Sequence, residues 1–142
     1  MNGFLLDTNV IYELVTPRPE PSVTQWVEGT DETSLHLSVL TLGEIRKGIV
    51  GLPQARRRAE LENWLNQGLR SRFAGRILPI DANVADRWGH VAAHARSRNI
   101  PLPVIDALLA ATALEHNLTL VTRNIRDVAG VGVSVLNPWE KP

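Results

Sequence analysis

The sequence predicts an α/β fold with three layers, in which a parallel sheet of about five strands lies between helices on both faces. Short apolar runs alternate along the chain with segments whose apolar residues recur at helical spacing. Helices between successive strands supply the crossovers that parallel strands need. The chain has 142 residues, so we expect one domain spanning residues 1–142.

The expected strands are compact apolar segments bounded by polar or turn residues. They cover residues 4–6, 35–40, 76–80, 118–122 and 131–136. The expected helices lie between them and carry apolar side chains three or four positions apart. They cover residues 10–15, 23–27, 41–49, 54–72, 81–97 and 104–116. Prolines at positions 17, 19 and 21 separate the first two helices, and Gly51 and Pro53 end the third.

Composition excludes several kinds of chemistry. The chain contains no cysteine, so disulfides, thiolate nucleophiles and cysteine-based zinc sites are excluded. This usage suits a reducing compartment. No apolar run approaches the roughly 20 residues of a membrane span, and no basic leader precedes the first strand. We therefore expect a soluble, cytoplasmic protein that does not enter a membrane.

The net charge of zero conceals a segregated pattern. Residues 1–50 carry three cations and seven anions, whereas residues 51–100 carry nine and four. Thirteen of the 15 cations are arginine, whose planar fork binds phosphate in a bidentate way. The run Arg56-Arg57-Arg58 is either a solvated helix face or a contact for RNA or a protein partner.

Acidic and amide side chains stand where strands end or helices begin. Asp7 follows the first strand, Glu44 and Asp106 lie near helix starts, and Asn124 and Asp127 follow the fourth strand. Ligands of open α/β sheets bind beyond the carboxyl ends of the strands. Carboxylates gathered there repel one another unless a cation joins them. Oxygen donors of this kind suit Mg²⁺ or Mn²⁺.

Asp7, Glu44 and Asp106, together with the neighbouring Asn9, also have purely structural interpretations, which for Asp7 is an Asx-turn. Thr41-x-x-Glu44 matches a capping box that closes a helix start. Asp106 near a helix N-terminus is stabilised by the helix dipole, and Asn9 suits a helix cap. The set argues against these roles for all of them, because Asp7 and Asp106 adjoin apolar residues and carboxylates are rarely buried without a partner.

Four ordered motifs resemble those of PIN-domain ribonucleases. The segment Leu5-Leu6-Asp7-Thr8-Asn9-Val10-Ile11 resembles the opening motif of that family. Residues 38–48, 106–113 and 120–124 resemble its second, third and fourth motifs. Residues 73–81 and 136–139 are similar to the VapC/FitB-type branch, the toxins of bacterial type II toxin–antitoxin pairs. The resemblance spans nearly the whole chain and implies a PIN-like fold.

The resemblance also implies a mechanism and its residues. Asp7 and Asp106 would be the main ligands of Mg²⁺ (or Mn²⁺), and Glu44 would bind it directly or through water. The metal would ionise a water that attacks an RNA phosphodiester. Asn124 would coordinate or hydrogen-bond, but it stands where many members have Asp and adds no negative charge. This difference argues against a second tightly held metal.

Thr8 and Thr122 would orient the carboxylates. The implied partners are an RNA substrate, a small DNA-binding antitoxin and a second copy of the chain. Two alternatives remain open at this point. One is a catalytically degenerate PIN-like module that only binds RNA or protein. The other is a phosphotransfer domain with Asp7 as nucleophile, although position 9 is Asn and the only lysines are Lys47 and Lys141.

Overall fold

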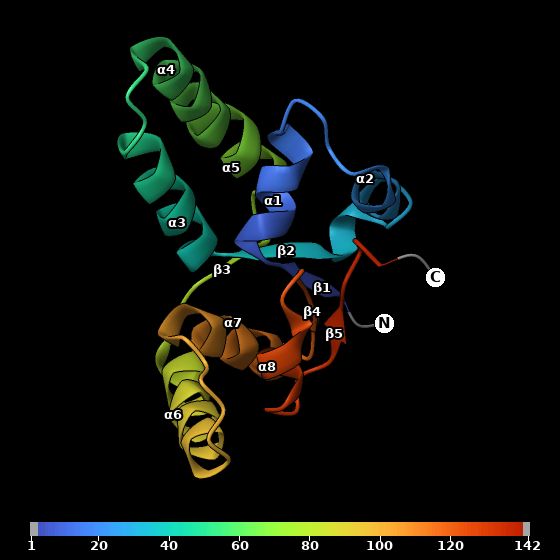
Figure 1. Ribbon diagram of the computed structural model, residues 1–142, viewed down its shortest axis with the longest axis vertical. Coiled ribbons are helices and arrows are strands. Elements are labelled where there is room, and N and C mark those ends of the chain that lie inside the picture. The colour runs from blue at the N-terminus through green and yellow to red at the C-terminus, as the bar shows by residue number, and fades with distance from the viewer. Residues whose placement is uncertain (1–2, 141–142) are drawn as a thin grey trace.

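A parallel five-stranded sheet forms the centre of the molecule, in the order β3-β2-β1-β4-β5 (Figure 1). The computed structural model describes residues 3–140, so Lys141 lies outside the described part. The strands are β1 (Phe4–Leu6), β2 (Leu35–Ser38), β3 (Ile77–Leu78), β4 (Thr119–Val121) and β5 (Val135–Leu136). All neighbouring strands pair in parallel, which confirms the predicted fold class.

Helices cover both faces of this sheet. In the view of Figure 1, α1 to α5 lie above the sheet and α6 to α8 below it. The upper layer contains α1 (Thr8–Val15), α2 (Pro21–Glu28), α3 (Val39–Val50), α4 (Ala55–Asn63) and α5 (Arg70–Arg72), with a π-helical segment at Trp64–Leu69 joining α4 to α5. The lower layer contains α6 (Ala82–Ser97), α7 (Val104–Glu115) and α8 (Ile125–Ala129). A short 3₁₀ helix, Glu32–Ser34, precedes β2.

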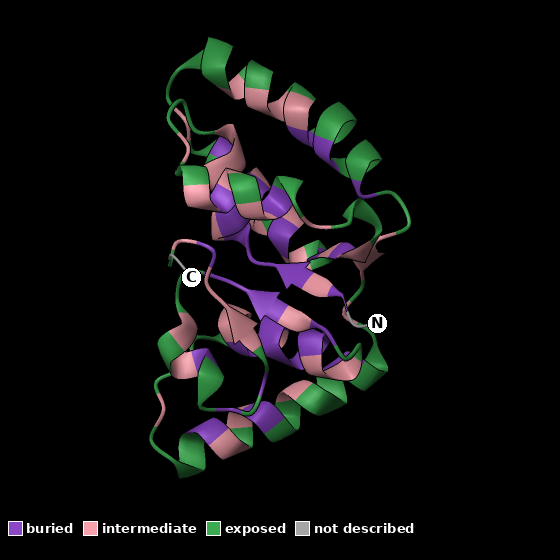
Figure 2. Ribbon diagram, turned by 90° about the vertical axis from the view of Figure 1, so that its right-hand side faces the viewer, coloured by how far each residue is buried: buried purple, intermediate pink, exposed green. Residues whose placement is uncertain are grey.

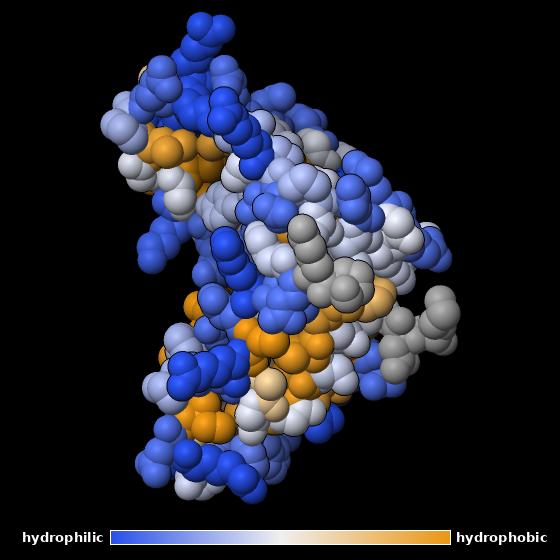
Figure 3. Space-filling view, turned by 45° about the vertical axis from the view of Figure 1, so that its right-hand side comes forward, coloured by the Kyte–Doolittle hydropathy of each residue, from blue (hydrophilic) through white to orange (hydrophobic). Residues whose placement is uncertain are grey.

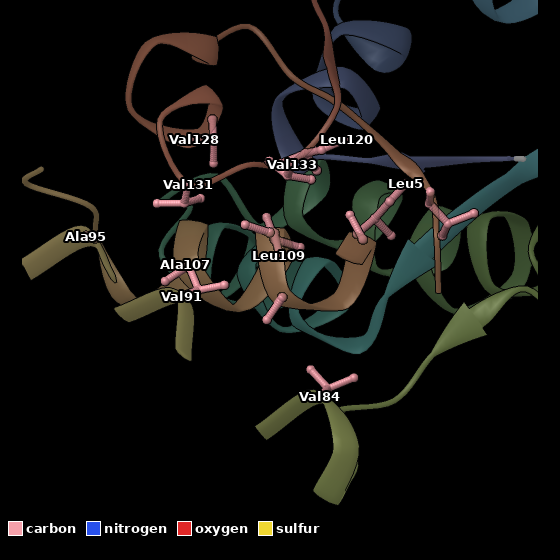
Figure 4. Close-up of a cluster of buried hydrophobic side chains, with 14 residues drawn as sticks. Leu5, Val84, Val91, Ala95, Ala107, Leu109, Leu120, Val128, Val131 and Val133 are labelled. Carbon is pink, nitrogen blue, oxygen red and sulfur yellow. The ribbon is translucent and has the colours of Figure 1, made fainter. Parts of the chain in front are cut away.

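Strand periodicity divides the buried side chains between two cores. Leu5 and Leu120 belong to the core shared with α6, α7 and α8, of which Figure 4 shows a close-up. Their neighbours Leu6 and Val121 belong to the opposite core, beneath α1 and α3. Successive strand residues point to opposite faces, so both faces of these central strands are buried. Buried residues accordingly occupy the middle of the molecule and exposed ones its outer helical faces (Figure 2).

The end of β2 differs from the prediction. We expected a strand over residues 35–40 and a helix from Thr41, but the strand ends at Ser38 and α3 begins at Val39. The Ser38 hydroxyl accepts a hydrogen bond from the Leu40 backbone N at 3.0 Å. This side-chain cap satisfies a free amide of the first turn and outweighs the strand preference of the apolar residues that follow. Thr41 and Glu44 therefore do not form the capping box that was the alternative interpretation of their spacing.

Several other elements also differ from the prediction, and the third strand, for example, covers Ile77–Leu78 instead of residues 76–80. The helix Ile125–Ala129 was not predicted, because five residues are too short to display a helical period. The last strand covers only Val135–Leu136 instead of residues 131–136. Val131 and Val133 are buried in the lower core without joining the sheet. Their hydrophobicity reflects packing rather than strand pairing.

The strand order places a topological switch point at the centre of the sheet. From β1 the chain passes to β2 and then β3 on one side, and it later returns to β4 and β5 on the other. Crossovers on opposite sides leave a crevice outside the carboxyl ends of β1 and β4, and ligands of open α/β sheets bind there. Asp7 and Thr122 follow these two strands directly.

Within residues 3–140, no helix has the length and apolar character needed to cross a membrane.

Close packing of α1 against α3 fixes the upper wall of this crevice. A Cβ at Gly48 would lie 2.6 Å from the Tyr12 hydroxyl oxygen and 3.7 Å from Tyr12 Cζ. The first separation is too short for non-bonded atoms, and the second is ordinary contact. Because Gly48 has no side chain, the hydroxyl of Tyr12 can pack directly against α3 at this position.

A pair of glycine variants tests this packing by urea denaturation. Gly89 lies in α6 with open space around its Cβ position, so Gly89→Ala is expected to raise the free energy of unfolding by about 0.5–1 kcal/mol. Gly48→Ala is expected to lose this gain, because its methyl group meets the Tyr12 hydroxyl. In a Tyr12→Phe background the gain should return. If Gly48→Ala has the same effect in both backgrounds, the hydroxyl does not limit the packing.

Candidate functional site

Asp7 occupies the N-cap of α1, immediately beyond the end of β1. Its backbone N donates to the carbonyl of Val121 at 2.9 Å, which extends the β1–β4 pairing to the site itself. Its Oδ1 accepts from the Thr8 backbone N at 2.7 Å. The residue is only 9% exposed. Because a carboxylate carries about four lone-pair directions, these contacts orient Asp7 and leave acceptor capacity for a cation.

Thr122 connects the ends of the two central strands. Its hydroxyl donates to Asp7 Oδ2 at 2.8 Å and accepts from the Asn124 backbone N at 3.2 Å. The side-chain amide of Asn9 lies 3.4 Å from both Asp7 Oδ2 and Thr122 Oγ1. The structure thus shows the hydrogen bond from Thr122 to a carboxylate that the family resemblance implied.

Asn9 is a site neighbour that the sequence interpretation treated only as a helix cap. The cap of α1 is Asp7, and Asn9 lies inside the helix with its side chain directed at the Asp7 carboxylate. Its Oδ1 atom is buried and has no hydrogen-bond partner within residues 3–140. The sequence spacing of Asp7 and Asn9 could have predicted this contact. In the first turn of a helix, the side chain two positions after the N-cap lies close to the N-cap side chain.

Glu44 reaches the site from the second turn of α3. The Thr8 hydroxyl donates to Glu44 Oε1 at 2.6 Å. The Thr8 hydroxyl oxygen also lies 3.2 Å from the hydroxyl oxygen of Thr41. With Ser38 as the cap of α3, Glu44 is not needed to close the helix. The structure therefore removes the structural interpretation of Glu44 and places its carboxylate against α1.

The opposite wall comes from α7 and α8. Asp106, in the first turn of α7, lines a cavity of about 430 Å³ together with Asn124 and Asp127. Asn124 stands at the N-cap of α8, but its side chain makes no capping hydrogen bond and is exposed. Asp127 lies in the first turn of α8, so the structure brings it to the same cavity as Asp106.

Negative charges act on one another across this crevice. Burial raises the pKa of Asp106, and the charges of Asp7, Glu44 and Asp127 raise it further. Burial also raises the pKa of Asp7; hydrogen bonds partly oppose this, and the charge of Glu44 adds to it. The carboxylates are therefore close enough that ionising them together is unfavourable without a cation.

These donors fit a hard divalent cation. Every donor is a carboxylate or amide oxygen, and the unpartnered Asn9 Oδ1 adds another beside Asp7. Mg²⁺ binds through one or two carboxylates and keeps several waters. Within residues 3–140, no three His, Cys, Asp or Glu side chains already stand close enough together to hold a metal. The oxygen chemistry of the donors, rather than a preformed cluster, is what fits Mg²⁺ or Mn²⁺.

The arginine run lies away from this crevice. Arg56 and Arg57 in α4 each come within 3.6 Å of Glu60, and Arg58 donates to the Leu52 carbonyl at 2.8 Å. Hydrophilic residues cover the upper end of the molecule, where α4 lies (Figure 3). These contacts match a solvated helix face, and they do not test whether the run also contacts RNA or a protein.

Fold and site together define a doubly wound α/β protein with an acidic site at the switch point of its sheet. The family model described as PIN domain matches residues 4–130. The chain belongs to the PIN domain family.

Relatives with names and solved structures cover nearly the whole chain. It is 36% identical over 135 residues to Toxin FitB of Neisseria gonorrhoeae, covering 95% of this chain and 97% of the relative. It is 32% identical over 136 residues to VapC ribonuclease Y4jK of Sinorhizobium fredii, covering 96% and 97%. The structure of FitAB bound to an IR36 DNA fragment matches with a TM-score of 0.93 and 33% identity, over 98% of this chain and 97% of that one.

Repulsion at the site predicts an unusual stability effect of Asp106. Because the folded state holds the Asp106 proton more tightly than the unfolded chain, the stability that this proton contributes is lost as the pH rises through the raised pKa. In EDTA at pH 7, Asp106→Asn is expected to raise the melting temperature by about 1–3 °C. Asp86→Asn, at an exposed position of α6, should leave it unchanged. A lower melting temperature for Asp106→Asn would contradict the repulsion.

Proposed function

We propose that the protein is an endoribonuclease dependent on Mg²⁺ or Mn²⁺ and the toxin of a type II toxin–antitoxin pair. One observation carries the proposal. Asp7, Glu44 and Asp106 come from three distant segments and lie around the switch point. Burial raises the pKa of Asp7 and of Asp106, the charge of Glu44 raises both further, and the charge of Asp7 adds to the shift of Asp106. Such an arrangement costs stability without a cation and is relieved by one. The names of the relatives, a toxin and a ribonuclease, support the same conclusion.

The protein's own groups prepare the reaction. Asp7 and Asp106 would hold the ion from the two sides of the crevice, and Glu44 would bind it directly or through water. Thr122 and the Thr8 backbone fix both oxygens of Asp7. A bound Mg²⁺ or Mn²⁺ supplies a Lewis acid that lowers the pKa of a water and offsets charge on the phosphoryl group.

The remaining site residues act on the substrate side of the crevice. The exposed amide of Asn124 has no capping role and is free to hydrogen-bond a phosphate oxygen or to coordinate. The Thr8 hydroxyl keeps Glu44 turned toward the crevice. The nucleophilic water would approach the RNA phosphodiester from the open side, which the cavity between α7 and α8 provides.

The proposed cellular setting includes two protein partners. A cytoplasmic nuclease of this kind must be held inactive, and a small DNA-binding antitoxin would do so by covering the crevice. The matched FitAB structure, which is bound to a DNA fragment, supports such a partner. We also expect a homodimer. Sedimentation of the purified chain alone and with its antitoxin measures both assemblies.

Site variants test the metal-dependent chemistry directly. Asp7→Asn and Asp106→Asn should each lower RNA cleavage in Mg²⁺ at least about 100-fold, because loss of a ligand exceeds loss of an outer hydrogen-bond partner. Thr122→Val should lower it about 10- to 100-fold by releasing Asp7. Asp86→Asn is the matched control, and circular dichroism confirms folding.

Two results would contradict the proposal. Cleavage by the wild type that persists in EDTA would exclude the metal mechanism. Tight RNA binding without cleavage in either Mg²⁺ or Mn²⁺ would instead identify a degenerate binding module.

A further inference from the structure

A cationic side chain stands beside the acidic crevice and is not explained by metal binding. Arg123 directly follows Thr122, and it lines the same 430 Å³ cavity as Asp106 and Asn124. Its side chain is exposed. Thr122 points back to the Asp7 carboxylate, so the next residue along the chain faces the opposite way, toward the solvent side of the site.

An aromatic ring holds this arginine in place. The Arg123 guanidinium carbon lies 5.1 Å from the centre of the Trp139 ring, within the range of a cation–π contact. Trp139 is itself anchored, because it packs against the upper core. Such stacking restricts the side chain before any ligand binds, so less conformational entropy is lost on binding.

The side chain of Asn137 hydrogen-bonds to the backbone of both Arg123 and Trp139. Asn137 Nδ2 donates to the Arg123 carbonyl at 3.3 Å, and its Oδ1 accepts from the Trp139 backbone N at 2.9 Å. One amide side chain therefore ties the segment after β4 to the segment after β5. These two hydrogen bonds hold the segments that carry Trp139 and Arg123 together beside the acidic crevice.

Arg123 has no carboxylate partner within residues 3–140, a property that it shares with several other arginines, whereas a second group of arginines is paired. Arg72 and Arg76 both pair with Glu32 at 2.9 Å, and Arg87 pairs with Glu115 at 3.2 Å. Near Arg123, three acidic residues, Asp106, Asp127 and Glu140, line the cavity, and within residues 3–140 none of them forms an ion pair with it. The guanidinium thus keeps its fork of donors free for an anion from outside.

We propose that Arg123, held by Trp139, binds a phosphate of the RNA strand next to the phosphodiester that is cleaved. The inference depends on the proposed ribonuclease function and adds a positioning residue to it. A guanidinium fork matches a phosphate with two parallel hydrogen bonds. It lines the same cavity as Asp106, so its charge would offset part of the repulsion between the carboxylates and the strand. Binding through phosphate rather than a base makes the contact independent of RNA sequence.

RNA binding at several salt concentrations tests the contact apart from cleavage. All proteins carry Asp7→Asn to prevent turnover, and the probe is a fluorescent single-stranded RNA in Mg²⁺. Adding Arg123→Gln should raise Kd about tenfold, the loss of one hydrogen-bonded charge. It should also reduce the slope of log Kd against log salt by about 0.7, the value for one phosphate on a single strand. Arg87→Gln, which removes an exposed arginine of α6 that pairs with Glu115, should change neither quantity.

Variants of the ring separate positioning from charge. Trp139→Leu removes the stacking but keeps the arginine, so Kd should rise severalfold while the salt slope stays at the value of the Asp7→Asn parent. Trp139→Phe retains an aromatic face and should restore most of the affinity. In the otherwise wild-type enzyme, Arg123→Lys should raise KM more than it lowers kcat, because the charge remains but the fork is lost.

The outcomes distinguish this inference from the proposed function. If wild-type protein cleaves RNA and Arg123→Gln leaves both Kd and salt slope unchanged, the phosphate contact is wrong and the ribonuclease stands. If Arg123→Gln weakens only the complex with the antitoxin, the arginine contacts an acidic segment of that protein instead. If wild-type protein neither binds nor cleaves RNA in Mg²⁺ or Mn²⁺, the proposed function and this contact both fail.

Discussion

The hydrogen bond from Thr122 to Asp7 is the contact on which the arrangement of the site depends. It joins the first residues beyond β1 and β4, the two strands that flank the switch point. Backbone pairing brings these residues together, since the Asp7 amide still donates to Val121. Two apolar cores on opposite faces of the central strands hold this register, because slipping by one residue would turn each buried side chain to the wrong face. Hydrophobic packing on both faces of the sheet thus holds the Asp7 carboxylate in position.

The site combines groups whose charges oppose and complement one another. Asp7, Glu44 and Asp106 gather negative charge in a partly buried crevice, which costs stability in the metal-free protein. Strained or repulsive sites of this kind are common where function outweighs stability. Arg123 stands just outside, stacked on Trp139 and free of ion pairs within the described residues. A polyanionic strand would meet a cation at the rim and carboxylates at the centre, which explains how a chain of zero net charge can suit RNA.

Hydrogen bonds of neutral side chains decide which carboxylates are available. Ser38 caps α3 and so frees Glu44 from the capping role that its sequence spacing suggested. Thr8 then binds Glu44 through its hydroxyl while its backbone binds Asp7. One residue of α1 therefore orients two acidic groups from different segments. Short polar side chains set the geometry, and the carboxylates keep oxygen atoms for a cation.

The sequence alone was enough to predict the fold class, the order of most elements and the acidic candidates, because strand and helix periods and the motif around Asp7 are local patterns. It also placed Asp106 correctly in the first turn of its helix. It did not determine the start of α3, the short helix α8 or the neighbourhood of Asn9 and Arg123. These depend on competing caps, on segments too short to show a period, and on contacts such as Arg123 with Trp139. Only the tertiary structure decided them, because residues far apart in the chain become neighbours when parallel strands align at one edge.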